Sequence, residues 1–155
     1  MQISKKGLDL LKTWEQGPNG GFAPTIYSCS AGKRTIGYGH VITADEDIKE
    51  PISEATAEEL LKKDVSVAED AVNRYVKIIL SQNRYDALVC FVFNVGVGNF
   101  KKSTLLSFVN NMLFDKVPDQ FLCWNKITVN GKKEVSEGLT NRRKAELALW
   151  NDAEN

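Results

Sequence analysis

Apolar residues recur with helical spacing near the start of the chain. Leu8 and Leu11 lie two turns and one turn before Glu15, Ser4 stands where an N-cap residue would, and a glycine-rich run follows at residues 17–21. Serine favours helix N-caps, and glycine ends helices. This pattern predicts a first helix with Glu15 near its C-terminal end.

Residues 25–42 follow a different pattern. The segment is rich in Ile, Tyr, Thr and Val, and it is interrupted by Gly32, Gly37 and Gly39. Branched and aromatic side chains favour strands, and glycine permits the turns between them. We therefore expect a small sheet or hairpin in this segment.

Helical spacing then returns and extends over the rest of the chain. Thr56 and Glu59 have the spacing of a capping box, and apolar residues recur every three or four positions as far as Val76. This pattern predicts one long helix that connects two lobes. Residues 81–95 are apolar almost all round, as in a helix at the centre of a bundle.

The C-terminal part predicts shorter helices at residues 104–113, 119–124 and 140–152, with a tight turn at Asn130-Gly131 between the last two. The expected fold class is therefore α+β. A small N-terminal sheet lobe would be joined by the long helix to a larger helical lobe.

Length and composition fit one globular domain, since 43% of the residues are apolar and 26% are charged. We expect a single domain over residues 1–155. The small lobe would cover about residues 16–55, and the helical lobe about residues 77–155 together with the N-terminal helix.

Positive and negative charges balance, because 20 Lys and Arg residues face 20 Asp and Glu residues. Such a chain has no net field to hold a polyanion, so we expect no nucleic-acid binding. The distribution is uneven: residues 43–70 hold ten acidic residues and three Lys, whereas residues 126–144 hold six Lys or Arg and two Glu. Each run alone is interpreted as a solvated surface.

The three cysteines, Cys29, Cys90 and Cys123, are an odd number with wide spacing. This argues against a disulfide framework or a zinc site and favours reduced thiols. Cys90 and Cys123 lie in apolar helical stretches, so we expect both in the core. No stretch of the sequence predicts a signal peptide or a membrane span.

Glu15 is one of twenty acidic residues, and its position alone does not select it. Its context does: Cys29 follows it, and after five more residues Thr35 opens the string TIGYGH at residues 35–40. A Glu at the end of the first helix, an Asp or Cys, five residues and a Thr in such a string form the signature of the phage endolysins of glycoside hydrolase family 24. The chain closely resembles this family.

Two further blocks, RYDALVCFVFNVGVGNF at residues 84–100 and GLTNRRKAELALW at residues 138–150, look like the central-helix and C-terminal-helix blocks of the same family. The resemblance thus spans nearly the whole chain. One departure is that the thirteen residues between Glu15 and Cys29 exceed the usual number. A longer turn costs little, so we expect the fold to survive and the lip of the cleft to differ.

The resemblance implies a lysozyme-like fold and an N-acetylmuramidase that hydrolyses the β-1,4 bond between N-acetylmuramic acid and N-acetylglucosamine in bacterial peptidoglycan. Glu15 would be the catalytic acid that protonates the leaving oxygen, while Cys29 and Thr35 would position the attacking water. A free thiol has a pKa of about 8.5, so Cys29 would be a weak base unless the site lowers that pKa. Because family members also use Asp here, the stereochemical course stays open.

The resemblance implies further roles for residues outside this trio. Arg142 would orient Glu15, and Val41, Phe93 and Ser103 would line the saccharide cleft. For Phe93, a plain core position is an equal alternative. The reaction would need no metal and no other cofactor.

The resemblance also implies a route of action. As an endolysin, the enzyme would lyse the host cell for phage release. It would wait in the host cytoplasm as a monomer, without membrane insertion, until a holin releases it to the cell wall. The basic segment at residues 126–144 would attract it weakly to an anionic wall.

Two alternatives remain at this point. His40, the only histidine, is expected to have a structural role beneath the hairpin, but it would be the base if Cys29 were the nucleophile of a peptidase that cuts the peptide stems. The other alternative is a wall-binding module without catalysis, if the cysteine had silenced the site. New reducing sugar ends would favour the glycosidase, and new amino termini the peptidase.

Overall fold

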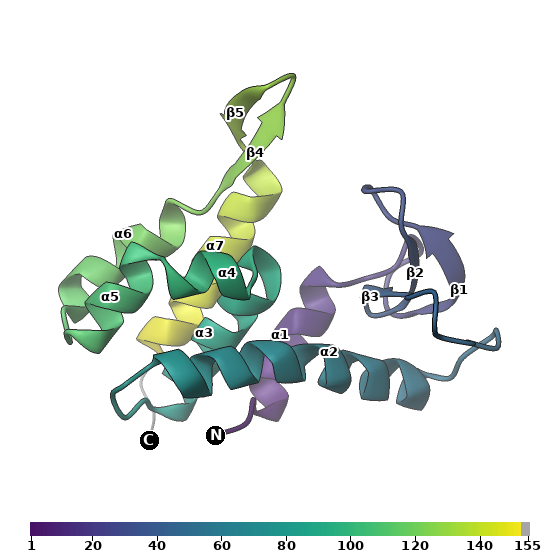
Figure 1. Cartoon of the computed structure of the whole chain (residues 1–155), viewed down its shortest axis with the longest axis horizontal. Helices are drawn as coiled ribbons and strands as arrows, with labels where there is room; N and C mark the ends of the chain where they lie inside the picture. Colours follow the sequence, from purple (N-terminus) through teal and green to yellow (C-terminus); the bar gives the residue numbers. More distant parts are fainter. Residues whose placement is uncertain (153–155) are drawn as a thin grey trace. The chain divides into compact units, whose positions relative to one another are not determined.

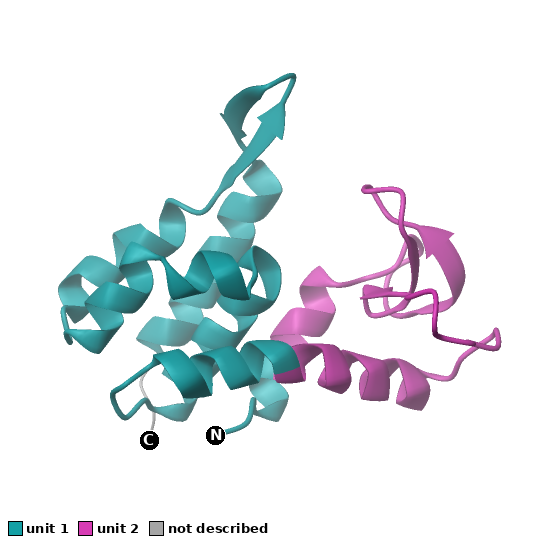
Figure 2. Ribbon diagram, in the orientation of Figure 1, with its two compact units in different colours: residues 1–7, 67–155 teal, residues 8–66 magenta. Residues whose placement is uncertain are grey.

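The chain folds into two compact units (Figure 2), and the computed structural model describes residues 1–152. Unit 1 comprises residues 1–7 and the chain from residue 67 onward, and unit 2 comprises residues 8–66. In chain order the elements are α1 (Lys5–Trp14), β1 (Ala23–Ser28), β2 (Arg34–Gly37), β3 (His40–Val41), α2 (Glu54–Tyr75), α3 (Gln82–Val95), α4 (Val97–Lys101), α5 (Thr104–Asn110), η1 (Phe114–Lys116), α6 (Val117–Leu122), β4 (Lys126–Val129), β5 (Lys132–Val135) and α7 (Glu137–Asn151). Figure 1 labels all of these except η1. The expected α+β class is confirmed. None of the helices in this described part is both long and apolar enough to cross a membrane.

Unit 2 contains the small sheet that the sequence predicted. Its three strands are antiparallel in the order β1-β2-β3, and Tyr27 on β1 lies opposite Thr35 on β2. Ile36 is fully buried, and a Cβ placed on Gly37 would lie 3.3 Å from the Cβ of Ala57 on α2. The middle strand therefore lies close to the first half of α2.

The starts of the first two helices show one correct prediction and one wrong one. The Gly7 amide donates to the Ser4 side chain at 3.3 Å, which confirms Ser4 as the N-cap of α1. The cap of α2 was wrongly assigned to Thr56, because the helix begins at Glu54 and the Thr56 amide donates to Ser53 Oγ at 3.1 Å. Ser53 caps as well as threonine does, and the two residues between them fit a helix, so the earlier cap extends α2.

Helix α3 is the central helix of unit 1, as residues 81–95 predicted, and α7 packs along it (Figure 1). Nine of its 14 residues are buried. The Phe91 ring meets Phe121 and Trp124 edge to face, with centroids 5.5 and 5.8 Å away. These contacts form the aromatic core of unit 1.

The helices after α4 differ in their bounds from the prediction. The helix expected at residues 104–113 ends at Asn110, and Met112 then adopts a positive φ of 57°, which a continuing helix does not allow. The next helix, α6, begins at Val117, two residues earlier than expected. Pro118 lies in its first turn, where proline needs no hydrogen-bonded amide.

The hairpin β4–β5 occupies residues 126–135, where the sequence predicted only a turn. Asn130 and Gly131 form that turn with φ of 51° and 80°, a conformation that the Asn-Gly pair favours. After the hairpin, Ser136 caps α7, which therefore begins at Glu137 instead of residue 140.

The two cysteines expected in the core differ in burial. Cys90 is buried on α3, but Cys123 is exposed, so its predicted core position was wrong. Cys123 follows the last residue of α6, and its thiol donates to the Gln120 carbonyl at 3.3 Å. The end of a short helix leaves such a side chain at the surface.

Candidate active site

Glu15 lies directly after α1 in unit 2. Its amide donates to the Leu11 carbonyl at 2.9 Å, so the residue completes the last helical turn, and its side chain is half-buried. The carboxylate lies against Gly39, where an added Cβ would come within 2.6 Å of Glu15 Oε2. Gly39 also has a φ of 72°, so the site requires glycine for both space and conformation.

Cys29 lies at the start of the tight turn between β1 and β2. Its amide donates to the Lys33 carbonyl at 3.0 Å, and its own carbonyl accepts from the Gly32 amide at 2.8 Å. Gly32 permits this turn with a φ of 76°. The half-buried side chain is thus held at a fixed place beside backbone amides.

The turn favours the thiolate form of Cys29. Hydrogen bonds from the amides of Lys33 and Ala31 and from the Thr35 hydroxyl lower the pKa of the Cys29 thiol, and they outweigh a smaller effect of burial that raises it. Hydrogen bonds to the charged form of a group favour that form. The turn therefore stabilises an anion at position 29.

Thr35 is 2% exposed, and its hydroxyl donates to the Lys33 carbonyl at 2.9 Å. The same hydroxyl is placed to donate to Cys29 when the thiol is ionised. A hydroxyl has only one proton to donate, so these two partners compete for it. Ionisation of Cys29 would thus draw the Thr35 proton away from Lys33.

Tyr27 is a site residue that the sequence analysis missed. Burial raises the pKa of Tyr27, and the charges of Cys29 and Glu15 raise it further. Charges act in this way only on groups in the same neighbourhood. Tyr27 is therefore within electrostatic range of both Cys29 and Glu15 in unit 2, and Thr35 lies opposite Tyr27 in the sheet.

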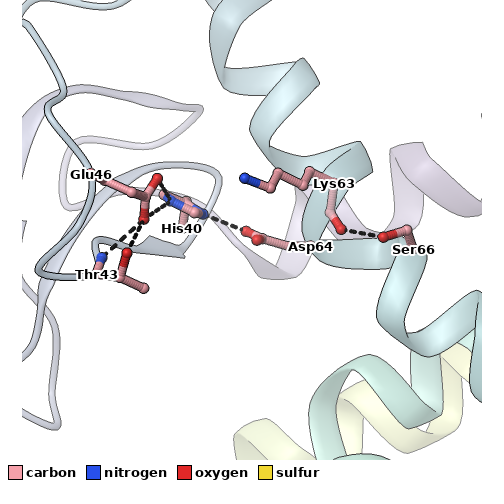
Figure 3. A network of polar contacts seen from close by, with 6 residues as sticks. All are labelled: His40, Thr43, Glu46, Lys63, Asp64 and Ser66. Carbon is pink, nitrogen blue, oxygen red and sulfur yellow. Dashed lines mark hydrogen bonds and ion pairs between the residues drawn. The ribbon is translucent and has the colours of Figure 1, made fainter.

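His40 lies on β3, and its ring is held between two carboxylates from other parts of unit 2 (Figure 3). Its Nδ1 lies 2.8 Å from Asp64 Oδ2, and its Nε2 lies 2.9 Å from Glu46 Oε2. Burial alone lowers the pKa of His40, but the hydrogen bonds and charges of Asp64 and Glu46 raise it above its usual value. Both ring nitrogens are therefore engaged, which fits the structural role expected for this residue.

The predicted substrate-binding residues fall in both units. Val41 belongs to unit 2 and is 42% exposed, whereas Phe93 and Ser103 belong to unit 1. Phe93 is half-buried on α3. Ser103 is the N-cap of α5, where its hydroxyl donates to the Phe100 carbonyl at 2.7 Å and accepts from the Leu106 amide at 3.1 Å.

Arg142 belongs to a buried charged cluster on α7 in unit 1. Its Nε lies 3.6 Å from Glu146 Oε2, and Arg143 Nε lies 2.9 Å from the other carboxylate oxygen. Arg143 also donates to Asn94 Oδ1 at 2.7 Å. The sequence analysis did not predict that Glu146 would be buried. It is fully buried on α7, a helix whose apolar periodicity is weak.

Comparison with known proteins decides the family. Residues 18–146 match the phage lysozyme family. The chain belongs to this family. The chain is 39% identical over 153 residues to the endolysin of Acyrthosiphon pisum secondary endosymbiont phage 1, covering 99% of this chain and 100% of that one.

Solved structures agree with this assignment. The endolysin from Escherichia coli O157:H7 phage FAHEc1 is 37% identical with a TM-score of 0.88, covering 98% of this phage lysozyme and 94% of that chain. The muramidase domain of SpmX from Asticaccaulis excentricus is 30% identical with a TM-score of 0.85, covering 98% and 99%. The predicted lysozyme-like fold and glycoside hydrolase class are thereby confirmed.

Proposed function

We propose that this phage lysozyme is an endolysin that hydrolyses the β-1,4 bond between N-acetylmuramic acid and N-acetylglucosamine, with Glu15 as its catalytic acid. The observation that carries this role is the pairing of a half-buried carboxyl against Gly39 with an anion-stabilising turn at Cys29 in the same unit. The similarity to endolysins and to a muramidase domain supports the bond that is cut.

Each group has one task in this reaction. Glu15 gives its proton to the oxygen that leaves with N-acetylglucosamine while positive charge develops at the anomeric carbon of N-acetylmuramic acid. The Cys29 thiolate and the Thr35 hydroxyl orient a water molecule, and the sulfur takes the water proton as the new C–O bond forms. The cycle closes when that proton returns to Glu15 through solvent.

The same proposal covers four further residues, Arg142, Val41, Phe93 and Ser103. Arg142 orients Glu15, and the other three line the saccharide cleft. Support comes from the family match, which covers all four positions. The hydroxyl of Ser103 is already used in capping α5, so its part in the cleft is to shape the wall through its position.

The Glu15→Gln variant tests the catalytic acid. The amide cannot donate an acidic proton, so we expect the release of reducing sugar ends from purified sacculi to fall by at least about 10²- to 10⁴-fold, the usual contribution of a general acid. Glu59→Gln, an exposed change on α2, is the matched control and should keep the parental rate. Equal rates for Glu15→Gln and the parent would exclude this role.

The arrangement around His40 argues against the peptidase alternative. A Cys-His peptidase needs an imidazole nitrogen free to take the thiol proton. Both ring nitrogens of His40 pair with carboxylates. The hydrogen bonds to the Cys29 sulfur come from backbone amides and Thr35, not from His40. New amino termini in the digest would nevertheless support the peptidase.

We also propose that the enzyme acts as a monomer and stays in the host cytoplasm until a holin opens the way to the wall. Expression in a bacterial host tests this route. We expect lysis of the culture only when a holin is expressed together with the enzyme. Lysis without a holin would mean that the enzyme reaches the wall by another route.

A further inference from the structure

The side chain of Tyr27 shares one face of the small sheet with Cys29 and Thr35. Tyr27 on β1 lies directly opposite Thr35 on β2. Residues paired in this way project from the same face, with Cβ atoms about 4.5–5.5 Å apart. Cys29 follows two residues after Tyr27, and the Thr35 hydroxyl is placed to donate to its thiolate. One face of unit 2 therefore carries all three polar groups.

An irregularity in β1 precedes Tyr27. Between Ala23 and Tyr27 the pairing with β2 shifts register, and it is regular from Tyr27 onward. Irregularities of this kind re-aim the side chains next to them. Within this segment the Ile26 amide donates to the Glu50 carboxylate, which lies outside the sheet. The backbone that aims Tyr27 is thus held from both sides.

The hydroxyl of Tyr27 is not used by the fold. Within residues 1–152 no hydrogen bond joins it to another residue. Two buried tyrosines differ in this respect: the Tyr38 hydroxyl donates to Glu54 at 3.1 Å, and the Tyr85 hydroxyl donates to the Met1 carbonyl at 2.8 Å. Tyrosine hydroxyls that leave water usually find such a partner. The half-buried Tyr27 therefore has a donor available for a ligand.

This donor is a neutral group beside the proposed reaction. Burial and the negative charges of Cys29 and Glu15 raise the pKa of Tyr27 above the usual value of about 10, so the hydroxyl keeps its proton near neutral pH. The same charges place Tyr27 within electrostatic range of the proposed acid and of the group that would hold the water. A substrate at these groups would therefore come near Tyr27.

The length of the tyrosine side chain determines what its hydroxyl reaches. In threonine the oxygen is bonded to Cβ, whereas in tyrosine a whole ring separates the oxygen from Cβ. Thr35 is 2% exposed, so its hydroxyl lies against the sheet, and Tyr27 is only half-buried. A water molecule held by Thr35 and Cys29 would lie close to the sheet, and Tyr27 extends past it. The phenol hydroxyl therefore reaches the sugar that this water attacks.

The chemistry of that sugar selects the acceptor. The water attacks the anomeric carbon, which is bonded within the ring to the ring oxygen and to C2. The ring oxygen shares the positive charge of the transition state, so it is a poor acceptor there. C2 carries an acetamido group, whose carbonyl oxygen is an uncharged acceptor. A neutral phenol donor matches this carbonyl.

We propose that the Tyr27 hydroxyl donates to the acetamido carbonyl of the N-acetylmuramic acid whose bond is cut, and that it makes the enzyme selective for N-acetylated over N-deacetylated muramic acid. This inference rests on the proposed function, since it takes that sugar as the substrate. A buried donor left without its acceptor disfavours the deacetylated sugar. Because the bond forms in both the bound substrate and the transition state, its loss falls on KM.

Removal of one hydroxyl tests the proposal. Tyr27→Phe keeps the ring, and Tyr75→Phe makes the same change on α2 in unit 1. Sacculi are offered in native form, N-deacetylated at muramic acid, and chemically re-acetylated. Release of reducing ends gives kcat and KM on each, and circular dichroism confirms folding. Calorimetric titration of the Glu15→Gln protein with soluble glycan strands gives the same comparison without turnover.

We expect Tyr27→Phe to raise KM on native and re-acetylated wall by about three- to tenfold, the usual effect of one neutral hydrogen bond, without changing kcat. In the Glu15→Gln background it should raise Kd for acetylated strands by the same factor. On deacetylated wall and strands Tyr27→Phe should match its parent. Tyr75→Phe should match the parent on every substrate.

Two results would overturn the proposal. One is a Tyr27→Phe variant with parental KM and Kd on acetylated material, which would mean that the hydroxyl does not contact the sugar. The other is an equal defect on acetylated and deacetylated material, which would exclude the acetamido group as its partner. Failure of the proposed function would look different, since the parent would then release no reducing ends from native or re-acetylated wall.

Discussion

Cys29 shows how a local backbone turn changes the chemistry of one side chain. The sequence pointed to Cys29 through its five-residue spacing to Thr35, but it did not predict that the pKa of the thiol would be lowered. That shift depends first on the amides of Lys33 and Ala31, which approach the sulfur only in the folded turn. Side-chain patterns carry no such information, because every residue except proline has a backbone N–H group.

The ionisation of Cys29 predicts its reactivity. Because the Thr35 hydroxyl helps to lower the pKa of the thiol, Thr35→Val should move the midpoint of alkylation by iodoacetamide to higher pH. The rate is followed by mass spectrometry in a Cys123→Ser background, where Cys90 is silent because burial raises its pKa. Thr25→Val on β1 is the control. An unchanged midpoint in Thr35→Val would mean that the Thr35 hydroxyl does not lower the pKa of Cys29.

Gly39 predicts a second effect at this scale. An alanine Cβ would come within 2.6 Å of Glu15 Oε2 at a φ of 72°, so Gly39→Ala should displace the carboxylate and lower activity about tenfold or more. Gly21→Ala is the matched control, since its φ is 61° and nothing lies within 4 Å of the added Cβ.

Both glycine variants should lose about 1–2 kcal/mol of unfolding free energy from the positive φ, as urea denaturation would measure. Only Gly39→Ala should lose activity beyond what this loss of stability explains. Equal activities in the two variants would mean that the contact with Glu15 does not matter.

At the scale of elements, apolar spacing predicted the existence of most helices, and local chemistry decided where they begin. Ser53 competed with Thr56 as a cap, and the pattern could not rank two hydroxyl residues that both precede helix-forming sequence. The five-residue helix α4 was not predicted, because so short a segment shows no period. The hairpin at residues 126–135 was missed although its Asn-Gly turn was noted, since all residues of both strands are exposed.

The link between β3 and α2 through His40 predicts how stability depends on pH. The folded pKa of His40 is raised above the unfolded value of about 6.5, so its stabilising effect is complete below about pH 6.5 and is lost as pH rises through the folded pKa. The pKa of Glu46 is lowered, so that group stays ionised in this range. We expect the free energy of unfolding to fall as pH rises from neutral to alkaline.

Asp64→Asn tests this link. The change removes the negative charge beside His40 Nδ1. We expect it to lower the free energy of unfolding by about 1.5–3 kcal/mol at pH 6, the usual value for a charged hydrogen bond, and by less at pH 9. Asp45→Asn, an exposed change in the loop after β3, is the control. Urea denaturation across this range would contradict the account if both variants kept the parental slope with pH.

At the scale of the molecule, the resemblance of three sequence blocks predicted the lysozyme-like fold, and the family match over residues 18–146 confirms it. The residues of unit 2 that carry the proposed chemistry, Glu15, Cys29 and Thr35, were all identified through the family resemblance, whereas their neighbour Tyr27 was not. Unit 1 was predicted less completely. Its buried cluster of Arg142, Arg143 and Glu146 places charges where a pattern of apolar residues leads one to expect core, because opposite charges can be buried when they pair, as Arg143 and Glu146 do.

The identity of the cut bond tests the central claim most directly. Sacculi digested to completion are reduced with borohydride, and the fragments are examined by mass spectrometry. We predict that each new chain end is a reduced N-acetylmuramic acid that keeps its peptide stem intact. Reduced N-acetylglucosamine ends, or fragments with new amino termini in the stems, would contradict the proposal.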